Sequence, residues 1–132
     1  MAQFFINSFV LDTIFSLHYS GDMEMKNAID CFSALAQETR LEILRFLVRM
    51  GSDGANAGRI AVQLGLPSAT LAFHLNNLTA ASLVIRQKRG RENIYRANIS
   101  AVHALSAYLL ENCCAGLDGD MIQQNIPAND VA

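Results

Sequence analysis

Apolar residues recur at helical spacing in several segments of the chain, and the breaks between these segments predict a mainly helical domain. The pattern becomes regular after Met25, where residues 26–36 place four apolar side chains on one predicted helical face: Ile29, Phe32, Leu35 and Ala36. The run 41–50 predicts a second helix, and Thr39 and Glu42 have the spacing of a capping box at its start. The turn-forming residues 51–54 are expected to end it.

Two further predicted helices are joined by a short turn. The first covers about residues 56–64 and ends at Gly65, a residue type favoured just beyond a helix C-terminus. The second covers about residues 68–80, after Pro67, and its inward stripe consists of leucines: Leu71, Leu75 and Leu78. Two helices joined by a three-to-four-residue turn that contains glycine form a helix-turn-helix.

The next segment predicts a β-hairpin and a last helix. Residues 83–88 and 92–96 are rich in β-branched or aromatic side chains, and Arg89-Gly90-Arg91 between them suits a tight hairpin. The last helix is expected to start at about Ser100, its N-cap, and to carry the apolar stripe Val102, Leu105, Leu109 and Cys113. The predicted fold class is therefore mainly α with a small β-hairpin wing (α+β), a winged helix-turn-helix.

Composition and domain organisation narrow the class of protein. The chain has 132 residues, of which 52% are hydrophobic and 17% charged, so it is neither disordered nor fibrous. No apolar run is long enough for a membrane span, and three cysteines, two of them adjacent, fit a reducing cytoplasm better than a secreted disulfide framework. We expect an N-terminal extension of uncertain role (1–24), one winged helix-turn-helix domain (25–115) and a polar tail (116–132).

Two origins are open for the first 22 residues. They are apolar and aromatic but have no clean period, no basic leading region and no cleavage site, so they do not predict a signal peptide. They could form an extra helix or strand on the domain. They could equally precede the natural start, since Met23 and Met25 lie just before the first regular helix.

Positive charge is concentrated in the middle of the chain. Residues 59–96 carry six basic residues and one acid, whereas the segments on either side are acidic. One basic block between acidic ends indicates a surface that meets a polyanion. The predicted hairpin holds four candidate contacts to a DNA backbone: Arg86, Lys88, Arg89 and Arg91. The alternative is a solvated basic loop that protects a sheet edge from aggregation.

Sequence-specific contacts are expected from the helix at 68–80. With its leucines inward, rotation about the helix axis brings another set of side chains outward: Ser68, Thr70, Ala72, Phe73, Asn76 and Asn77. Small residues let a helix lie deep in a major groove, asparagine can pair with adenine, and Ala, Thr and Phe can contact thymine methyl groups. His74 lies at the edge of the inward stripe and is interpreted as a hydrogen-bonded, half-buried histidine.

Together these segments resemble a known family of regulators. The resemblance rests on residues 32–36 and 39–44, on Leu71 to Leu78 with its His74-Leu75 pair, on Leu83-Val84, and on Arg89-Gly90-Arg91 followed by Tyr95. They resemble the ArsR/SmtB family of bacterial metal-responsive repressors over about residues 25–115. The resemblance implies a homodimer held by the first and last helices, a palindromic double-stranded operator, and release from DNA when an inducer binds.

The inducer site departs from the better-known patterns of that family. Residues 32–112 hold no cysteine, and the last helix offers His103 and Glu111 without their usual partners, which disfavours zinc. The vicinal pair Cys113-Cys114 is similar to that of arsenic-sensing members. It implies a site for trivalent arsenic or antimony, inorganic or methylated, with no permanently bound cofactor.

The metalloid site has one further candidate ligand. Arsenite can exchange three hydroxyl groups, and Cys31 is the only remaining thiol that could supply the third ligand. Alternatively, Cys31 is a small buried residue of the core and not a ligand. A methylated trivalent arsenical exchanges two groups, so Cys113 and Cys114 alone could bind it.

Other functions remain alternatives. One is a thiol-redox or sulfide-responsive repressor on the same fold that uses Cys31 with Cys113 or Cys114. Another is a winged helix used only for protein contacts, against which the basic hairpin argues. An enzyme is not expected, because the sequence has no Ser/His/Asp spacing, no phosphate-binding glycine loop and no clustered carboxylates.

Overall fold

The structure, a computed structural model, describes residues 23–115. The elements in chain order are α2 (Met25–Leu35), α3 (Glu38–Met50), the 3₁₀ turn η2 (Gly51–Asp53), β1 (Ala55–Asn56), α4 (Ala57–Leu64), α5 (Ser68–Ala80), β2 (Val84–Arg89), β3 (Glu92–Ala97) and α6 (Ile99–Leu110). The N-terminal extension up to residue 22 and the tail from 116 lie outside the described residues. Within the described part, no helix is long and apolar enough to cross a membrane.

A three-stranded antiparallel sheet in the order β1-β3-β2 forms the wing. The hairpin pairs run from Val84↔Ala97 to Arg89↔Glu92, close to the predicted bounds. The short strand β1 adds Ala55↔Tyr95 and Asn56↔Ile94, and its two residues are too few to show a period in the sequence. The predicted fold class is confirmed: a mainly helical winged helix-turn-helix with a small antiparallel sheet.

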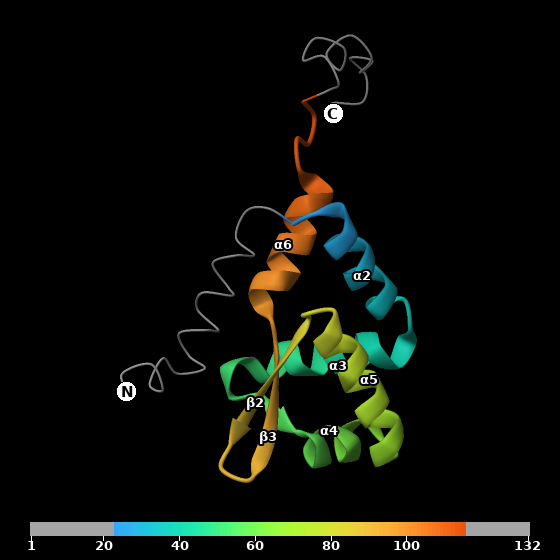
Figure 1. The fold of residues 1–132 in the computed structure, drawn as a ribbon, viewed down its shortest axis with the longest axis vertical. Coiled ribbons are helices and arrows are strands. Elements are labelled where there is room, and N and C mark those ends of the chain that lie inside the picture. The colour runs from blue at the N-terminus through green and yellow to red at the C-terminus, as the bar shows by residue number, and fades with distance from the viewer. Residues whose placement is uncertain (1–22, 116–132) are drawn as a thin grey trace, which may run out of the picture.

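The core lies where α3, α5 and the start of β2 meet. The predicted inward stripe of α5 is confirmed, since its three leucines are at most 1% exposed. They pack with other fully buried side chains from neighbouring elements, which include Ile43, Leu47, Ile60 and Leu83. In Figure 1, α2 and α6 lie at one end of the molecule, whereas α4, α5 and the hairpin lie at the other.

The face of α2 that is buried in the single chain consists of small residues and is not the predicted apolar stripe. The buried residues are Ala28, Cys31 and Ala34, whereas Ile29 is 56% and Phe32 is 40% exposed. Small side chains let α2 approach α3 and α5 closely, and its larger apolar side chains therefore point away from the core. The predicted apolar stripe of α2 therefore lies mostly outside the core, and of its members Leu35 packs partly against the core.

Two predicted helix starts are corrected by the observed caps. Gln37, not Thr39, caps α3, and its side chain accepts a hydrogen bond from Arg40 N at 2.8 Å. Asn98, not Ser100, caps α6 and accepts from Ala101 N at 3.2 Å. An amide oxygen placed slightly earlier in the chain takes the place of the expected hydroxyl. The last helix also ends at Leu110, so Cys113 lies beyond it.

Candidate nucleic-acid interface and thiol pair

Helix α5 presents a continuous exposed face opposite its buried leucines. Five of the six predicted contact residues lie on it and are exposed: Ser68, Thr70, Ala72, Phe73 and Asn76. Phe73 is 60% exposed, which is unusual for a phenylalanine in a domain with a well-packed core. The turn before the helix is made by Gly65 in the left-handed conformation, with φ 64° and ψ 37°. The side chains on this face are uncharged and, apart from Phe73, small. The helix can therefore lie against the floor of a DNA major groove.

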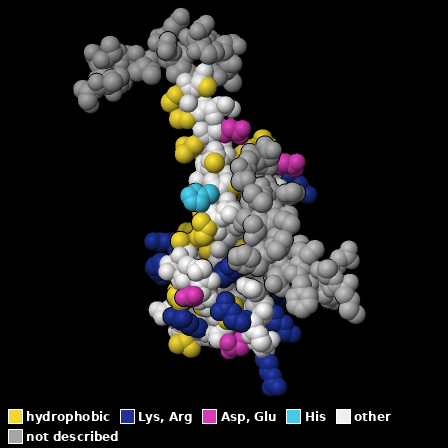
Figure 2. All heavy atoms as spheres, turned by 90° about the vertical axis from the view of Figure 1, so that its left-hand side faces the viewer, with side chains coloured by type: hydrophobic (Ala, Val, Ile, Leu, Met, Phe, Trp, Pro, Cys, Tyr) yellow, Lys and Arg dark blue, Asp and Glu magenta, His cyan; other side chains and the backbone are white. Residues whose placement is uncertain are grey.

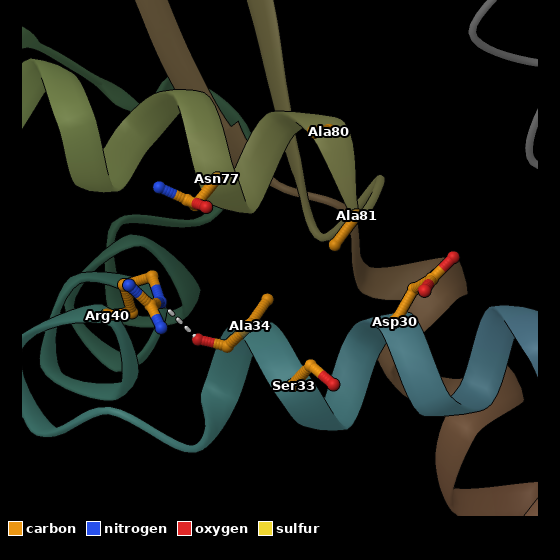
Figure 3. Close-up of a pocket in the computed structure, with 7 residues that line it drawn as sticks. All are labelled: Asp30, Ser33, Ala34, Arg40, Asn77, Ala80 and Ala81. Atoms are coloured by element: carbon orange, nitrogen blue, oxygen red, sulfur yellow. Dashed lines mark hydrogen bonds between the residues drawn. The ribbon is translucent and has the colours of Figure 1, made fainter.

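The sixth predicted residue, Asn77, lies at the edge of this face. It is only partly exposed, and its Nδ2 donates a hydrogen bond to Phe73 O at 2.8 Å. It also lines a cavity between α2, α3 and α5, as Figure 3 shows. Asn77 therefore bonds within α5 and forms part of the cavity wall, and it is less available for contact with DNA than the five exposed residues.

His74 is buried at 8% exposure, in line with its interpretation from the sequence. Its Nδ1 lies 3.5 Å from Nη1 of Arg40, whose Nε donates a hydrogen bond to Ala34 O. The imidazole also meets the ring of Phe73 edge-on, with 5.4 Å between ring centroids. Arg40 thus connects the end of α2 to α5, a role that sequence patterning missed because its partners lie six and 34 residues away.

The wing places its four predicted cations, Arg86, Lys88, Arg89 and Arg91, at exposed positions. The tight connection is made by Gly90 with φ 64°. Figure 2 shows Lys and Arg side chains gathered toward the lower end of the molecule, where the wing and the helix-turn-helix lie in Figure 1. Phosphates bind to such a surface largely through the release of counterions.

Asn56 connects the wing to the helix-turn-helix. Its Oδ1 accepts a hydrogen bond from Arg59 N at 2.8 Å and so caps α4, while its Nδ2 donates to Glu92 Oε1 at 3.2 Å. The same residue pairs with Ile94 in the sheet. One asparagine therefore fixes the base of α4 against β3. Its position at the start of the helix predicted over about residues 56–64 was the only sequence signal for this role.

Cys113 and Cys114 lie on the surface just beyond α6. Their sulfur atoms are 3.4 Å apart and share a hydrogen bond. This bond, and the repulsion between two sulfurs that would both carry negative charge, raise the pKa of the Cys113 thiol. Asn112 and Cys114 both have positive φ, at 56° and 63°, so the pair lies in a tight turn. This turn brings two exposed thiols within reach of one soft atom.

Cys31 lies apart from this pair, in the core. It has no exposed surface, and its Sγ donates a hydrogen bond to Ala81 O at 3.5 Å. Burial, and secondarily the charge of Asp30, raise the pKa of its thiol. Among residues 23–115, no three His, Cys, Asp or Glu side chains come together as a metal-binding group. The structure thus brings two of the three predicted thiol ligands together and leaves Cys31 elsewhere.

Known proteins with similar sequences and structures indicate the family to which the chain belongs. A family model described as a helix-turn-helix domain matches residues 35–87, from the end of α2 into β2. The HTH-type transcriptional regulator MJ1325 of Methanocaldococcus jannaschii is 36% identical over 70 residues, which span 53% of this chain and 76% of that protein. The solved structure of an ArsR-like transcriptional regulator from Rhodococcus sp. RHA1 is also 36% identical. It has a TM-score of 0.58, over 64% of this chain and 76% of that one.

The chain belongs to the ArsR family of winged-helix transcriptional regulators. HlyU from Vibrio cholerae has the same fold, with 25% identity and a TM-score of 0.52 over 67% of this chain and 98% of that one. The resemblance inferred from the sequence is confirmed. This ArsR-family protein is accordingly a transcriptional regulator of a DNA-binding family, and not an enzyme.

Proposed function

We propose that this ArsR-family regulator is a homodimeric repressor that leaves its operator when Cys113 and Cys114 bind a trivalent arsenical or antimonial. The observation that carries the proposal is the pair of exposed sulfur atoms 3.4 Å apart. A reducing cytoplasm would keep both thiols available. The proposal has three parts, which concern DNA, the dimer and the inducer.

The DNA part is supported by two neighbouring surfaces of different character. The exposed face of α5 has the size and chemistry to read bases in a major groove, with Asn76 as the candidate partner of adenine. The wing adds exposed cations suited to phosphates, which give affinity without sequence preference. Asn56 fixes the start of α4 against β3, and α4 packs against α5, so the two surfaces would bind DNA as a unit.

The dimer part is supported by apolar side chains that the single chain leaves exposed. On α2 these are Met25, Ile29 and Phe32, and on α6 they are Leu109 and Leu110, all at least 40% exposed. The two helices contact each other at one end of the molecule, and Figure 2 shows hydrophobic side chains along this upper part. A second copy that buries the same patch would give a two-fold dimer in which each α5 faces one half-site.

The inducer part follows from ligand exchange at the thiol pair. Each thiol that binds replaces one hydroxyl group on arsenic: an As–S bond forms, an As–OH bond breaks, and the thiol proton leaves with the hydroxyl as water. A methylated trivalent arsenical has two such hydroxyl groups, which Cys113 and Cys114 match. Arsenite has a third, for which Cys31 is the candidate, and its thiol would first have to give up its hydrogen bond to Ala81 O.

Release would arise from the position of the pair at the end of α6. A turn tightened around arsenic would change how α6 meets α2 and the partner subunit. The two α5 helices of the dimer, called the reading helices here, must be separated by about one DNA turn, and this separation would change with it. A coupling free energy of about 2–3 kcal/mol would weaken operator binding roughly a hundredfold.

The test is fluorescence anisotropy of the reduced full chain on DNA from upstream of its own gene. Arsenite and methylarsenite are titrated separately, with zinc as a control. We expect either arsenical, but not zinc, to release the wild type. Cys113→Ser and Cys114→Ser should bind DNA normally and should not be released, whereas Cys31→Ala tests the third ligand. Normal release of either serine variant would show that the assigned thiol site is wrong.

The same pair supports a second candidate function, a repressor that responds to thiol oxidation or to persulfide. Two exposed sulfurs in mutual contact are accessible to such reagents. This candidate predicts tight DNA binding by the reduced protein, release by peroxide or a persulfide donor, and no release by arsenicals. The anisotropy experiment therefore separates the two.

A further inference from the structure

A cavity of about 310 Å³ lies between α2, the start of α3 and the last turns of α5, away from the thiol pair. It is lined by Asp30, Ser33, Ala34, Arg40, Asn77, Ala80 and Ala81. Figure 3 shows α5 on one side of this space and α2 on the other, with Arg40 and Asp30 at its two ends. A volume of this size is at the lower end of the range for small-molecule sites.

The two charged side chains of the cavity have opposite sign and do not pair with each other. The carboxylate of Asp30 has no hydrogen bond or ion pair within residues 23–115, and the same holds for the hydroxyl of Ser33, one turn further along α2. Arg40, on the opposite side in Figure 3, is held by Ala34 O and lies against His74. The cavity thus has an acidic wall and a basic wall, with small alanine side chains between them.

We propose that this cavity binds a small zwitterion of the amino-acid class and that its occupancy changes DNA affinity. Its ammonium group would meet Asp30 and Ser33, and its carboxylate would meet the guanidinium of Arg40. Such a ligand satisfies both walls at once, whereas a simple cation or anion would leave one charged wall unmatched. Ala80 and Ala81 leave the room that the carbon chain of the ligand needs.

The cavity is connected to the reading helix α5 in two ways: Arg40 contacts it from α3, and Asn77 belongs to it. Arg40 lies 3.5 Å from His74, and Asn77 donates to Phe73 O. Phe73 and His74 are in edge-to-face contact, and Phe73 is on the exposed face of α5. A ligand carboxylate that attracts Arg40 weakens its interaction with His74 and so shifts α5 relative to α2. The binding of a ligand in this cavity does not depend on the proposed DNA binding. Only the measurement of its effect on DNA affinity does.

Binding is tested by NMR titration of the ¹⁵N-labelled, reduced full chain. The probes are glycine, β-alanine, 4-aminobutyrate and 6-aminohexanoate, which separate the two charges by increasing lengths, with butylamine and butyrate as single-charge controls. We expect saturable shifts of the amides around the cavity with at least one zwitterion, and at least tenfold weaker binding of both controls. Absence of saturable shifts with all four zwitterions would overturn the proposal.

Variants then assign the site. Asp30→Asn removes the acidic wall and Ala80→Leu fills the cavity, and each should weaken binding at least tenfold. Asp53→Asn, an exposed carboxylate in η2, is the matched control and should bind as the wild type does. Unchanged affinity in Asp30→Asn would overturn the assignment.

The coupling is measured by anisotropy with the zwitterion that binds. Operator affinity should change at least threefold at saturation, in the wild type and equally in the Cys113→Ser, Cys114→Ser double variant. An unchanged affinity would overturn the regulatory half of the proposal. Failure of arsenical release, by contrast, leaves the NMR result intact, so the two proposals fail separately.

Discussion

Gly54 lies where the chain after η2 passes closest to β3. Its φ is 62°, and a Cβ atom there would collide with the backbone oxygen of Tyr95 and come within 2.7 Å of Arg96 Cγ. The backbone oxygen cannot rotate away as the end of a side chain can. Both the conformation and the space at this position therefore require glycine.

Gly54→Ala should lower the free energy of unfolding by about 1–3 kcal/mol more than Gly51→Ala does. Gly51 is a matched control, because its φ of 65° is nearly the same but its added Cβ would meet nothing within 4 Å. The difference between the two variants therefore isolates the collision with β3. Urea unfolding followed by circular dichroism measures both. Equal losses would show that backbone strain alone sets the cost.

Individual residues were predictable from the sequence where the role of the side chain is local or periodic. The buried leucines of α5 and the left-handed Gly65 follow from spacing and conformation. The N-caps of α3 and α6 were predicted at the wrong residues. Several polar residues near each helix start can cap the helix, and the course of the backbone determines which of them does so. The contact of Arg40 with His74 depends on how α3 packs on α5, which no local pattern contains.

If the wing binds phosphates as proposed, its contribution to DNA affinity should be separable from that of α5. Arg91→Ala should weaken binding to operator and unrelated DNA alike, because binding to phosphates does not depend on sequence. The slope of log K against log salt should become shallower by about 1 for each phosphate that the variant no longer neutralises. Anisotropy at several salt concentrations measures this slope. Weaker binding to the operator alone would mean that the wing reads bases.

The reading helix should show the opposite behaviour. Asn76→Ala removes an exposed amide from the face of α5, and we expect a loss of about 1–3 kcal/mol on the operator. Non-specific affinity and the salt slope should stay unchanged. Arg91→Ala is the counterpart control, measured on the same two DNAs. A uniform loss on both DNAs would place Asn76 against the backbone instead of a base.

At the element scale, helices and hairpin strands were predictable within a few residues because their periods are long enough to detect. The two-residue strand β1 was not. Helix α2 has two apolar faces, and the spacing of apolar residues predicted the one with the larger side chains. The structure buries the face of small residues, Ala28, Cys31 and Ala34, and leaves the other exposed. The stripe of larger side chains is thus a real apolar surface, but the spacing of apolar residues alone does not say which of the two faces packs against the core.

The whole molecule has two ends of different chemistry. The exposed face of α5 and the cations of the wing lie toward one end, and the apolar patch of α2 and α6 lies at the other (Figures 1 and 2). The thiol pair follows α6 and therefore belongs to the apolar end. An inducer bound there would not touch DNA directly, and it would act through the geometry of the dimer. Only a differential effect on the free and DNA-bound arrangements could cause release.

Ile29→Glu tests that dimer directly. Ile29 is 56% exposed in the single chain, so glutamate should not disturb the core, but an unpaired carboxylate would be costly inside an apolar interface. We expect a folded monomer by light scattering with size-exclusion chromatography, and operator affinity at least tenfold weaker.

Val62→Glu is the matched control. Val62 lies on α4, away from the patch, and is 86% exposed, so the same charge introduced there should leave the protein dimeric. Its DNA affinity is not part of the comparison, because α4 belongs to the helix-turn-helix. A dimeric Ile29→Glu protein with wild-type operator affinity would show that α2 does not form the interface. The route from the thiol pair to the reading helices would then have to run within one chain.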